Sequence, residues 1–204
     1  MDMEELLDVY DEDGSPAGCA SRSRVHAEGL LHQVVHCWVI GKTAPVLYFQ
    51  QRAHDKQDFP GYFDLACGGH IGAGETPKQA MIREIREEIG LQLEPERLVS
   101  LGKYRAPDFQ IPGYYDRTIS NVFVLRQDMP AFSLGEEVAA MLCVQAADFY
   151  RMELEGAAEI PADTMRGVRI YTSRDRWCCH DGEFAAVVLP YLRTAFPHSI
   201  FPGD

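Results

Sequence analysis

The sequence predicts an α/β fold in which a mixed β-sheet is sandwiched between helices. Apolar runs typical of strands lie both before and after an amphipathic helix at residues 76–90, and a second helix is predicted late, at residues 146–154. The 204 residues suffice for one sizeable domain with a full core. We therefore expect a single domain over residues 1–204, with residues 155–204 as a C-terminal helical extension.

Turn residues divide the rest of the chain into short strands. Asp11-Glu12-Asp13-Gly14 separates the first two and predicts a hairpin, and a loop over residues 51–61 ends at Pro60-Gly61. Strands are predicted, in chain order, at residues 5–10, 17–22, 34–40, 46–51, 63–67, 98–104 and 118–125.

The C-terminal extension contains one more predicted helix. Asp181 is its expected N-cap, and Pro190 is expected to kink it. Its apolar stripe consists of Phe184, Val187, Val188, Tyr191 and Leu192.

The helix at residues 76–90 has a complete set of start and stop signals. Thr76 is the expected N-cap, Pro77 occupies the first helical position, and Gln79 completes a capping box. Gly90 ends the helix, where a left-handed cap favours glycine. The apolar stripe is formed by Met81, Ile85 and Ile89, and the turns of the preceding loop are permitted by Gly69, Gly72 and Gly74.

Three carboxylates share one face of this helix. Glu84, Glu87 and Glu88 stand at i, i+3 and i+4, where like charges repel unless a cation lies among them. Such clustered oxygen ligands suit Mg²⁺ or Mn²⁺. Arg83 is expected on a different face from Glu84.

The stretch from Gly69 to Leu91 matches the pattern G-x5-E-x7-R-E-U-x-E-E-x-G-U, with U aliphatic, at every fixed position. It resembles the Nudix box. The resemblance implies the Nudix fold and a pyrophosphohydrolase that cleaves a diphosphate linkage in a nucleoside or other organic diphosphate by water attack. It implies Mg²⁺ (or Mn²⁺) as cofactor, bound by Glu84, Glu87 and Glu88.

The same resemblance assigns roles around the metal. Arg83, Glu87 and Glu88 are expected to be catalytic, with Arg83 orienting the box carboxylates. The general base is either Glu88 or a glutamate outside the box, for which Glu136 and Glu137 are the candidates.

A second resemblance covers roughly residues 6–150. It is carried by Asp8-Val9-Tyr10-Asp11, Arg22 to His26, Leu30-Leu31-His32, Gln51-Arg52, Lys56 and Pro60-Gly61. These look like the isopentenyl-diphosphate isomerase branch of the Nudix superfamily. There, residues matching Arg52 and Lys56 hold a diphosphate, and histidines matching His26, His32 and His70 help to bind a metal. Arg52, Lys56, Gly69, His70 and Glu75 are therefore the expected substrate-binding residues.

The isomerase itself needs a cysteine directly before the box glycine, and Gly68 holds that place. Cys67 is one residue too early, so its thiol would point to the other face of a strand. Asp116-Arg117-Thr118 stands where the branch has a catalytic glutamate. Hydrolysis is favoured, with isomerisation and a non-catalytic phosphoryl-binding module as alternatives.

The charge and hydropathy of the sequence limit the kinds of binding partner that we expect. A net charge of −12 argues against a general nucleic-acid binder. The acidic N-terminus lacks the features of a signal peptide, and no apolar run is long enough for a membrane helix. We expect a cytoplasmic enzyme acting on a small-molecule diphosphate, with no nucleic acid and no membrane as partner. A homodimer, common in the Nudix family, stays open.

The cysteines and aromatics allow further interpretations. The 6 cysteines suggest no disulfide framework, in keeping with a reduced compartment. One alternative interpretation of Cys178-Cys179-His180 is a zinc site, although adjacent cysteines rarely fit tetrahedral coordination. The aromatics that could line a substrate pocket, or only pack, are Tyr104, Phe109, Tyr114 and Tyr115.

Overall fold

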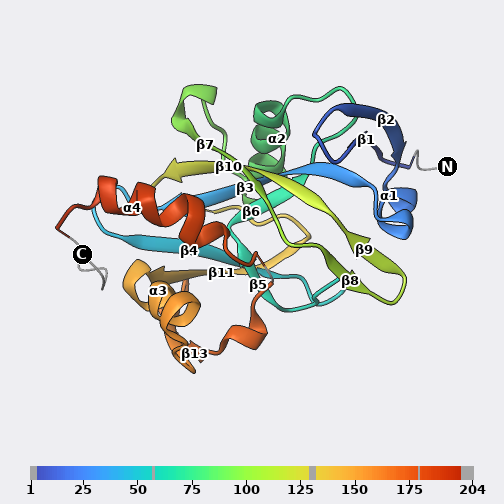
Figure 1. Ribbon diagram of the computed structural model, residues 1–204. Helices are drawn as coiled ribbons and strands as arrows, with labels where there is room; N and C mark the ends of the chain where they lie inside the picture. The colour runs from blue at the N-terminus through green and yellow to red at the C-terminus, as the bar shows by residue number, and fades with distance from the viewer. Residues whose placement is uncertain (1–3, 57, 129–131, 179, 199–204) are drawn as a thin grey trace.

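The protein, described here from a computed structural model, has a mixed β-sheet between helices, as predicted (Figure 1). The structure describes residues 4–56, 58–128, 132–178 and 180–198. Helix α2 (Pro77–Ile89) covers one face of the sheet, and α3 (Ala146–Glu155) and α4 (Leu189–Ala195) cover the other. A short helix α1 (Arg22–Glu28) connects β2 to β3.

The main sheet is organised around the ten-residue strand β3 (Leu31–Ile40). Along one edge, β3 pairs in parallel with β10 over its whole length, from His32–Thr118 to Ile40–Arg126. Along the other edge it pairs antiparallel with β1, β6 and β4 in succession. The remaining strands of this sheet are β1 (Leu6–Tyr10), β2 (Pro16–Ser21), β4 (Val46–Arg52), β5 (Phe63–Leu65), β6 (Cys67–His70), β7 (Leu98–Arg105), β10 (Thr118–Arg126), β11 (Val138–Gln145), β12 (Ile160–Thr164) and β13 (Arg169–Thr172).

Most predicted strands are confirmed, and the differences have local causes. The single strand expected at residues 63–67 is two strands, β5 and β6, which pair with different neighbours. A separate hairpin, β8 (Phe109–Ile111) with β9 (Tyr114–Asp116), was not predicted because its strands are only three residues long, too short to show a periodic pattern. Strand β3 begins at Leu31, three residues earlier than predicted. The prediction began later because His32 and Gln33, near the start of the strand, are polar.

Helix α2 follows its sequence signals closely. The backbone N–H of Gln79 donates to the Thr76 hydroxyl, and the Gln79 amide oxygen accepts from the Thr76 N–H at 3.0 Å. Gly90 closes the helix in the left-handed region, with φ 69°. Met81, Ile85 and Ile89 are fully buried against β3. The helix is therefore fixed at both ends and along one side, which sets the direction of its carboxylates.

The C-terminal extension differs from the predicted helical segment. Strands β12 and β13 come first, because Ile160 and Ala162 alternate inward and continue the sheet from β11. Asp181 does not cap the final helix, and its carboxylate accepts from Arg174 at 2.9 Å instead. The helix opens as a π turn over Phe184–Val188 just before Pro190, which has no N–H to donate to the preceding turn.

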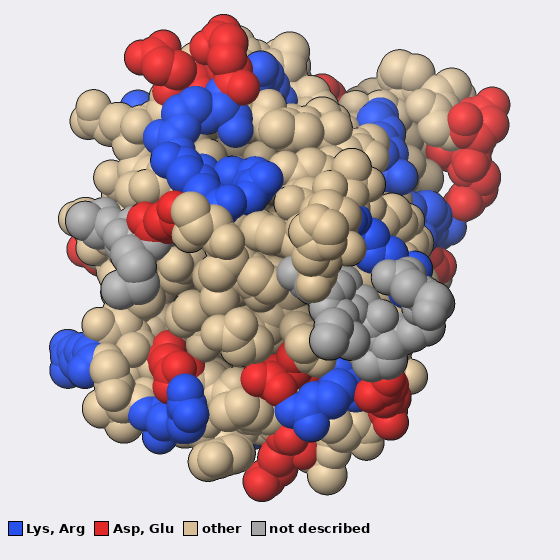
Figure 2. Space-filling model, turned by 90° about the vertical axis from the view of Figure 1, so that its left-hand side faces the viewer, with Lys and Arg blue, Asp and Glu red and all other residues tan. Residues whose placement is uncertain are grey.

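Charged side chains are mixed on the surface. On the face shown in Figure 2, basic and acidic side chains are interspersed around areas without charge. None of the helices in the described part of the chain is long and apolar enough to cross a membrane. The cysteines that the structure describes are free thiols.

Candidate active site

A cavity of about 450 Å³ lies beside the acidic face of α2. Its lining includes Glu84, Glu87 and Glu88 together with Gly68 and Gly69 of β6. The cations Arg52 and Lys56 also line it, as do Phe109 and Tyr114 of the β8–β9 hairpin. The structure thus brings the box carboxylates and the predicted phosphate-binding cations to one space.

Arg83 connects the box carboxylates. Its NH1 lies 2.6 Å from Oε1 of Glu84 and 3.4 Å from Oε2 of Glu87. Glu87, at i+4, shares the helix face of Arg83, whereas the side chain bends to reach Glu84, which helical spacing places on another face. Its Nε and NH2 donate to both oxygens of Glu75, at 3.2 and 3.0 Å, and NH2 also donates to the backbone oxygen of His70. Hydrogen bonding to Glu75 raises the pKa of Arg83 further, so it stays charged.

Glu84 and Glu88 are buried carboxylates with raised pKa values. Burial raises the pKa of Glu88 to about 8, and the charge of Glu84 adds to the shift. Burial likewise raises the pKa of Glu84 to about 7, against the opposing effect of Arg83. Glu88 accepts from the Gly68 N–H at 3.1 Å and from the Gln50 amide at 3.3 Å. Two such carboxylates are costly to ionise together, which favours a cation beside them.

The donor set of the box fits a divalent cation in chemistry. It consists of hard carboxylate oxygens on one helix face, as Mg²⁺ and Mn²⁺ prefer. Arg83 pairs with both Glu84 and Glu87. A second group of possible metal ligands adjoins the cavity, and one of its members, His70, lines it.

That second group is His26, His32 and His70, the three histidines that the isomerase-branch resemblance singled out. One ligand atom from each lies within 4.8 Å of the others, and no other group of His, Cys, Asp and Glu in the described residues is as compact. Among the residues that the structure describes, Nε2 of the buried His32 and Oδ1 of Asp116 have no hydrogen-bond partner, and these two atoms lie 3.6 Å apart. Burial lowers the pKa of all three imidazoles. Neutral imidazoles beside an unsatisfied carboxylate oxygen fit a metal ion.

The predicted substrate-binding residues divide into two groups. Arg52, Lys56, Gly69 and His70 line the cavity, whereas Glu75 does not and instead binds Arg83. Arg52 is held by the backbone oxygen of Asp58 at 2.9 Å and by Asp64 at 3.3 Å. Lys56 lies 2.7 Å from Glu137.

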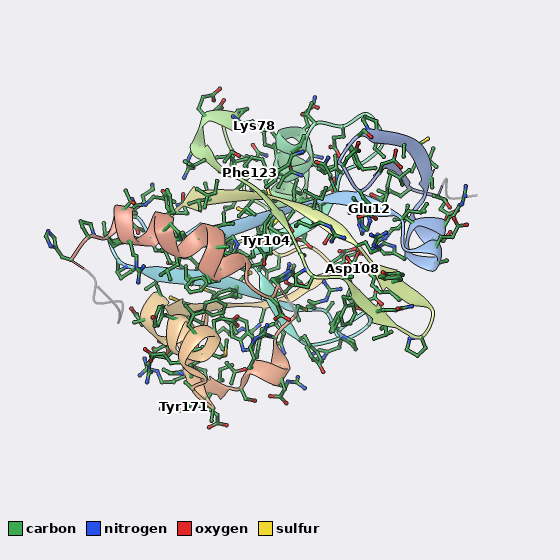
Figure 3. The ribbon with its side chains drawn as sticks, in the orientation of Figure 1. Glu12, Lys78, Tyr104, Asp108, Phe123 and Tyr171 are labelled. Carbon is green, nitrogen blue, oxygen red and sulfur yellow. The ribbon has the colours of Figure 1, made fainter. Side chains whose placement is uncertain are left out.

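Some of the candidates for the general base and for the aromatic lining of the pocket lie at the cavity, and others do not. Glu137 lines the cavity and Glu136 does not. Phe109 and Tyr114 line it, whereas the Tyr104 hydroxyl donates to the backbone oxygen of Asp181, and Tyr115 bonds Asp108 (Figure 3). The zinc alternative rests partly on Cys179, which lies outside the described residues.

Cys67 lies away from the cavity. It is fully buried in the cluster between the sheet and α2, and burial together with the charge of Glu88 raises the pKa of its thiol well above the usual value. Its neighbour Gly68 faces the cavity instead. The one-residue offset noted in the sequence therefore removes the thiol from the site, which argues against isomerase chemistry.

Sequence reasoning gave no role in the cavity to several residues that line it, namely His36, Gln50, Asp64 and Phe59. Arg22 and His180 also line the cavity, although the sequence named them only for the isomerase resemblance and the zinc alternative. His36 was detectable as a polar residue on the same strand face as His32 and Val34. Phe59 has φ 49°, a left-handed conformation that is costly for an aromatic residue and that is found often at functional sites.

The comparisons agree with this geometry. The family model described as NUDIX domain matches residues 30–162, more than half of the chain. The chain belongs to the Nudix family. An uncharacterised Nudix hydrolase of Clostridium acetobutylicum is 30% identical over 72% of this chain and 73% of its own length. Nudix hydrolase 3 of Arabidopsis thaliana is 38% identical, and the matched part covers 78% of this chain but 22% of that protein.

The isomerase branch is represented as well. An isopentenyl-diphosphate delta-isomerase of Corynebacterium diphtheriae is 32% identical over 69% of this chain and 79% of its own length. A crystal structure from Deinococcus radiodurans covers 67% of this chain and 81% of that chain, with a TM-score of 0.51 and 23% identity, which supports the fold. The protein is thus a Nudix enzyme of the family whose hydrolases act on diphosphate-containing substrates, related to the isomerase branch.

Proposed function

We propose that this Nudix protein is a Mg²⁺- or Mn²⁺-dependent pyrophosphohydrolase that cleaves a nucleoside or other organic diphosphate by water attack. The observation that carries the proposal is the cavity itself. Its lining includes Glu84, Glu87 and Glu88 together with the cations Arg52 and Lys56, which supports the proposal. A diphosphate carries negative charge on both phosphoryl groups, so it needs cations on more than one side.

Two arginines of the cavity have different roles in this proposal. Arg83, fixed by Glu75, orients Glu84 and Glu87. Arg52 offers a planar fork to phosphoryl oxygens, and Asp58 and Asp64 hold its direction. A divalent cation, when bound by the box carboxylates, supplies charge neutralisation on the diphosphate and makes water more acidic.

Two glutamates compete for the role of general base. Glu88 is buried and already accepts two hydrogen bonds. Glu137 lines the same cavity, is 59% exposed and is held by Lys56. We favour Glu137, because its carboxylate is exposed to water whereas that of Glu88 is buried. Its neighbour Glu136, outside the cavity, is a matched control.

We also propose that His26, His32 and His70, with Asp116, hold a second metal ion. The buried unpartnered atoms of His32 and Asp116 support this assignment. A cytoplasmic location and a homodimer stay predictions. The open possibility of a purely phosphoryl-binding module is addressed by the same experiment as the hydrolase proposal.

The test is a panel of nucleoside and other organic diphosphates incubated with the full chain and Mg²⁺ or Mn²⁺, with phosphate and monophosphate release measured. Isopentenyl diphosphate is included and its isomers are analysed in parallel. We expect metal-dependent hydrolysis of at least one substrate, lost in Glu87→Gln and Glu88→Gln and reduced in Glu137→Gln but not in Glu136→Gln. Unchanged turnover in Glu87→Gln and Glu88→Gln would reject the proposed site, and tight binding without any product would favour the binding module.

A further inference from the structure

The cavity contains two histidines that the Nudix box does not include. His36 lies on β3, on the same strand face as Val34 and His32. His180 comes from the C-terminal segment, far along the chain. Both line the cavity, and their rings meet edge to face with centroids 4.7 Å apart. The C-terminal segment therefore contributes a polar side chain to the same space as the box.

A buried carboxylate anchors each imidazole. Glu183 lies 2.8 Å from Nδ1 of His36 and also accepts from the Trp38 indole at 2.9 Å. Despite burial, the charge and hydrogen bond of His36 keep the pKa of Glu183 low, at about 2, so this carboxylate only accepts. Nδ1 of His36 must therefore carry the proton. A carboxylate on one nitrogen fixes the ring's orientation and stabilises its charged form.

The second pair has the same design. Oδ1 of Asp64 lies 2.6 Å from Nε2 of His180, and Oδ2 lies 3.3 Å from NH1 of Arg52. Asp64 thus holds His180 and Arg52 next to each other. Although burial opposes it, the charge of Asp64 and its hydrogen bond raise the pKa of His180. The proposed diphosphate site at Arg52 therefore extends without a break to the two histidines.

Each ring keeps its other nitrogen for a ligand. Within the described residues, no group hydrogen-bonds to Nε2 of His36 or to Nδ1 of His180. The side chains retain 12% and 25% exposure, and both belong to the cavity lining. Gly68 lies beside the first of them, since a Cβ built there would be 3.5 Å from Cδ2 of His36. Gly68 also binds Glu88, so the histidines adjoin the box wall.

A purely structural role for these pairs explains less. The C-terminal segment is already attached by other contacts. The Cys178 N–H donates to the Phe63 oxygen at 2.8 Å, the Tyr104 hydroxyl donates to the Asp181 oxygen at 2.8 Å (Figure 3), and Trp177 is buried in the core. Buried ion pairs add little net stability compared with apolar packing. Two such pairs on a cavity wall, each with an unused nitrogen, indicate ligand contact.

We propose that His36 and His180 form a phosphoryl-binding subsite that holds one phosphoryl group of the substrate while the box holds the other. The proposal rests on the proposed function, because a diphosphate is its ligand. Nε2–H of His36 and Nδ1–H of His180 donate to phosphoryl oxygens. Arg52, which shares Asp64 with His180, adds a guanidinium beside these two donors. Asp64 and Glu183 are positioning residues.

The test uses methylenediphosphonate, a diphosphate analogue that cannot be hydrolysed, titrated calorimetrically into the full chain with Mg²⁺. We expect His36→Gln and His180→Gln each to weaken its binding by about tenfold or more, as loss of a charge-assisted hydrogen bond predicts. The affinity of the box carboxylates for Mn²⁺ should be the same in these two variants as in the wild type. His198→Gln, at an exposed histidine, is the matched control and should bind like the wild type.

The positioning role has a separate readout. Asp64→Asn should shift the pH at which methylenediphosphonate affinity falls toward lower values, because His180 loses the carboxylate that raises its pKa. A purely structural Asp64 would leave that pH unchanged. Thermal unfolding of every variant identifies those that do not fold, and the measurement on the wild type below does not depend on them.

Histidine ring nitrogens labelled with ¹⁵N allow direct detection in the wild type. Methylenediphosphonate should shift the His36 and His180 signals and leave that of His198 in place. Unmoved signals, or wild-type affinity in folded His36→Gln and His180→Gln variants, overturn the subsite even if metal-dependent hydrolysis is found. Shifted signals and weakened binding in a chain that hydrolyses nothing support the subsite and overturn the proposed hydrolase function.

Discussion

A Cβ on residue 69 would lie 2.2 Å from Oε1 of Glu84, inside the space that this carboxylate occupies. Gly69 is not among the glycines with positive φ, whereas Gly74 is, with φ 77°. The first glycine of the box is therefore required for space and not for backbone freedom. It lets strand β6 approach the acidic face of α2 directly, and it determines where the Glu84 carboxylate can stand.

Gly69→Ala should displace the Glu84 carboxylate and weaken metal binding. We expect the affinity for Mn²⁺ and the value of kcat/KM to fall by about tenfold or more, as for other changes around metal ligands. Calorimetry and product release measure the two effects. Gly72→Ala is the matched control, because its Cβ would be at an ordinary distance of 3.5 Å from Glu75. Equal losses in both variants would mean that the loop, and not Glu84, is affected.

The buried box carboxylates predict an unusual dependence of stability on pH. Glu84 and Glu88 have pKa values of about 7 and about 8 in the fold, above the ordinary 4.5. Between the ordinary pKa of 4.5 and these raised values, the folded state therefore holds more protons than the unfolded state. The free energy of unfolding falls as the pH rises through this range. The neutral histidines of the cluster act in the opposite direction below about pH 6.5.

Metal-free protein should thus lose free energy of unfolding between about pH 6.5 and 8.5, on the order of 1–2 kcal/mol. Urea unfolding in the presence of a chelator measures this loss. Glu88→Gln should flatten the dependence because its amide does not titrate, and Mg²⁺ should restore stability most strongly at the higher pH. A stability that rises over this range would contradict the assigned shifts.

Helix α2 shows what sequence can predict. Thr76, Pro77, Gln79 and Gly90 act through bonds within a few residues, so their effect needs no knowledge of the rest of the fold. The box carboxylates follow, since helical spacing fixes their common face. Arg83 was harder to place, because a long side chain can bend to Glu84 although backbone geometry separates their directions.

The rest of the cavity depends on contacts between distant residues. His180 and Asp64 are 116 positions apart, and His36 and Glu183 are 147 positions apart. No periodic pattern in the sequence around these residues predicts that the two pairs form. Strand β3 was predicted to start late for a related reason, since buried His32 and Gln33 read as surface residues until Asp116 and Asn121 are placed beside them.

The histidine cluster predicts a second metal equivalent. His32→Asn should remove one bound transition-metal ion per chain, or weaken it by roughly 10–100-fold, while Mg²⁺-dependent hydrolysis at the box persists in part. Titration with Mn²⁺ and Zn²⁺, read as stoichiometry, measures the change. The exposed His54 provides a control, His54→Asn, that should keep the wild-type stoichiometry. If His32→Asn also keeps it, the cluster packs without a metal.

The isomerase resemblance implies a catalytic cysteine at the position of Gly68, and Gly68→Cys tests how far this one residue decides the reaction. A Cβ there would lie 3.0 Å from the Val35 oxygen and 3.5 Å from His36, so the variant should fold with a loss of about 1 kcal/mol. Its thiol would face the cavity. We expect no exchange between the isopentenyl diphosphate isomers, because Asp116 stands where the branch has its second catalytic group and faces His26 and His32. Product analysis by NMR decides, and any isomer formed by Gly68→Cys would show that Asp116 suffices.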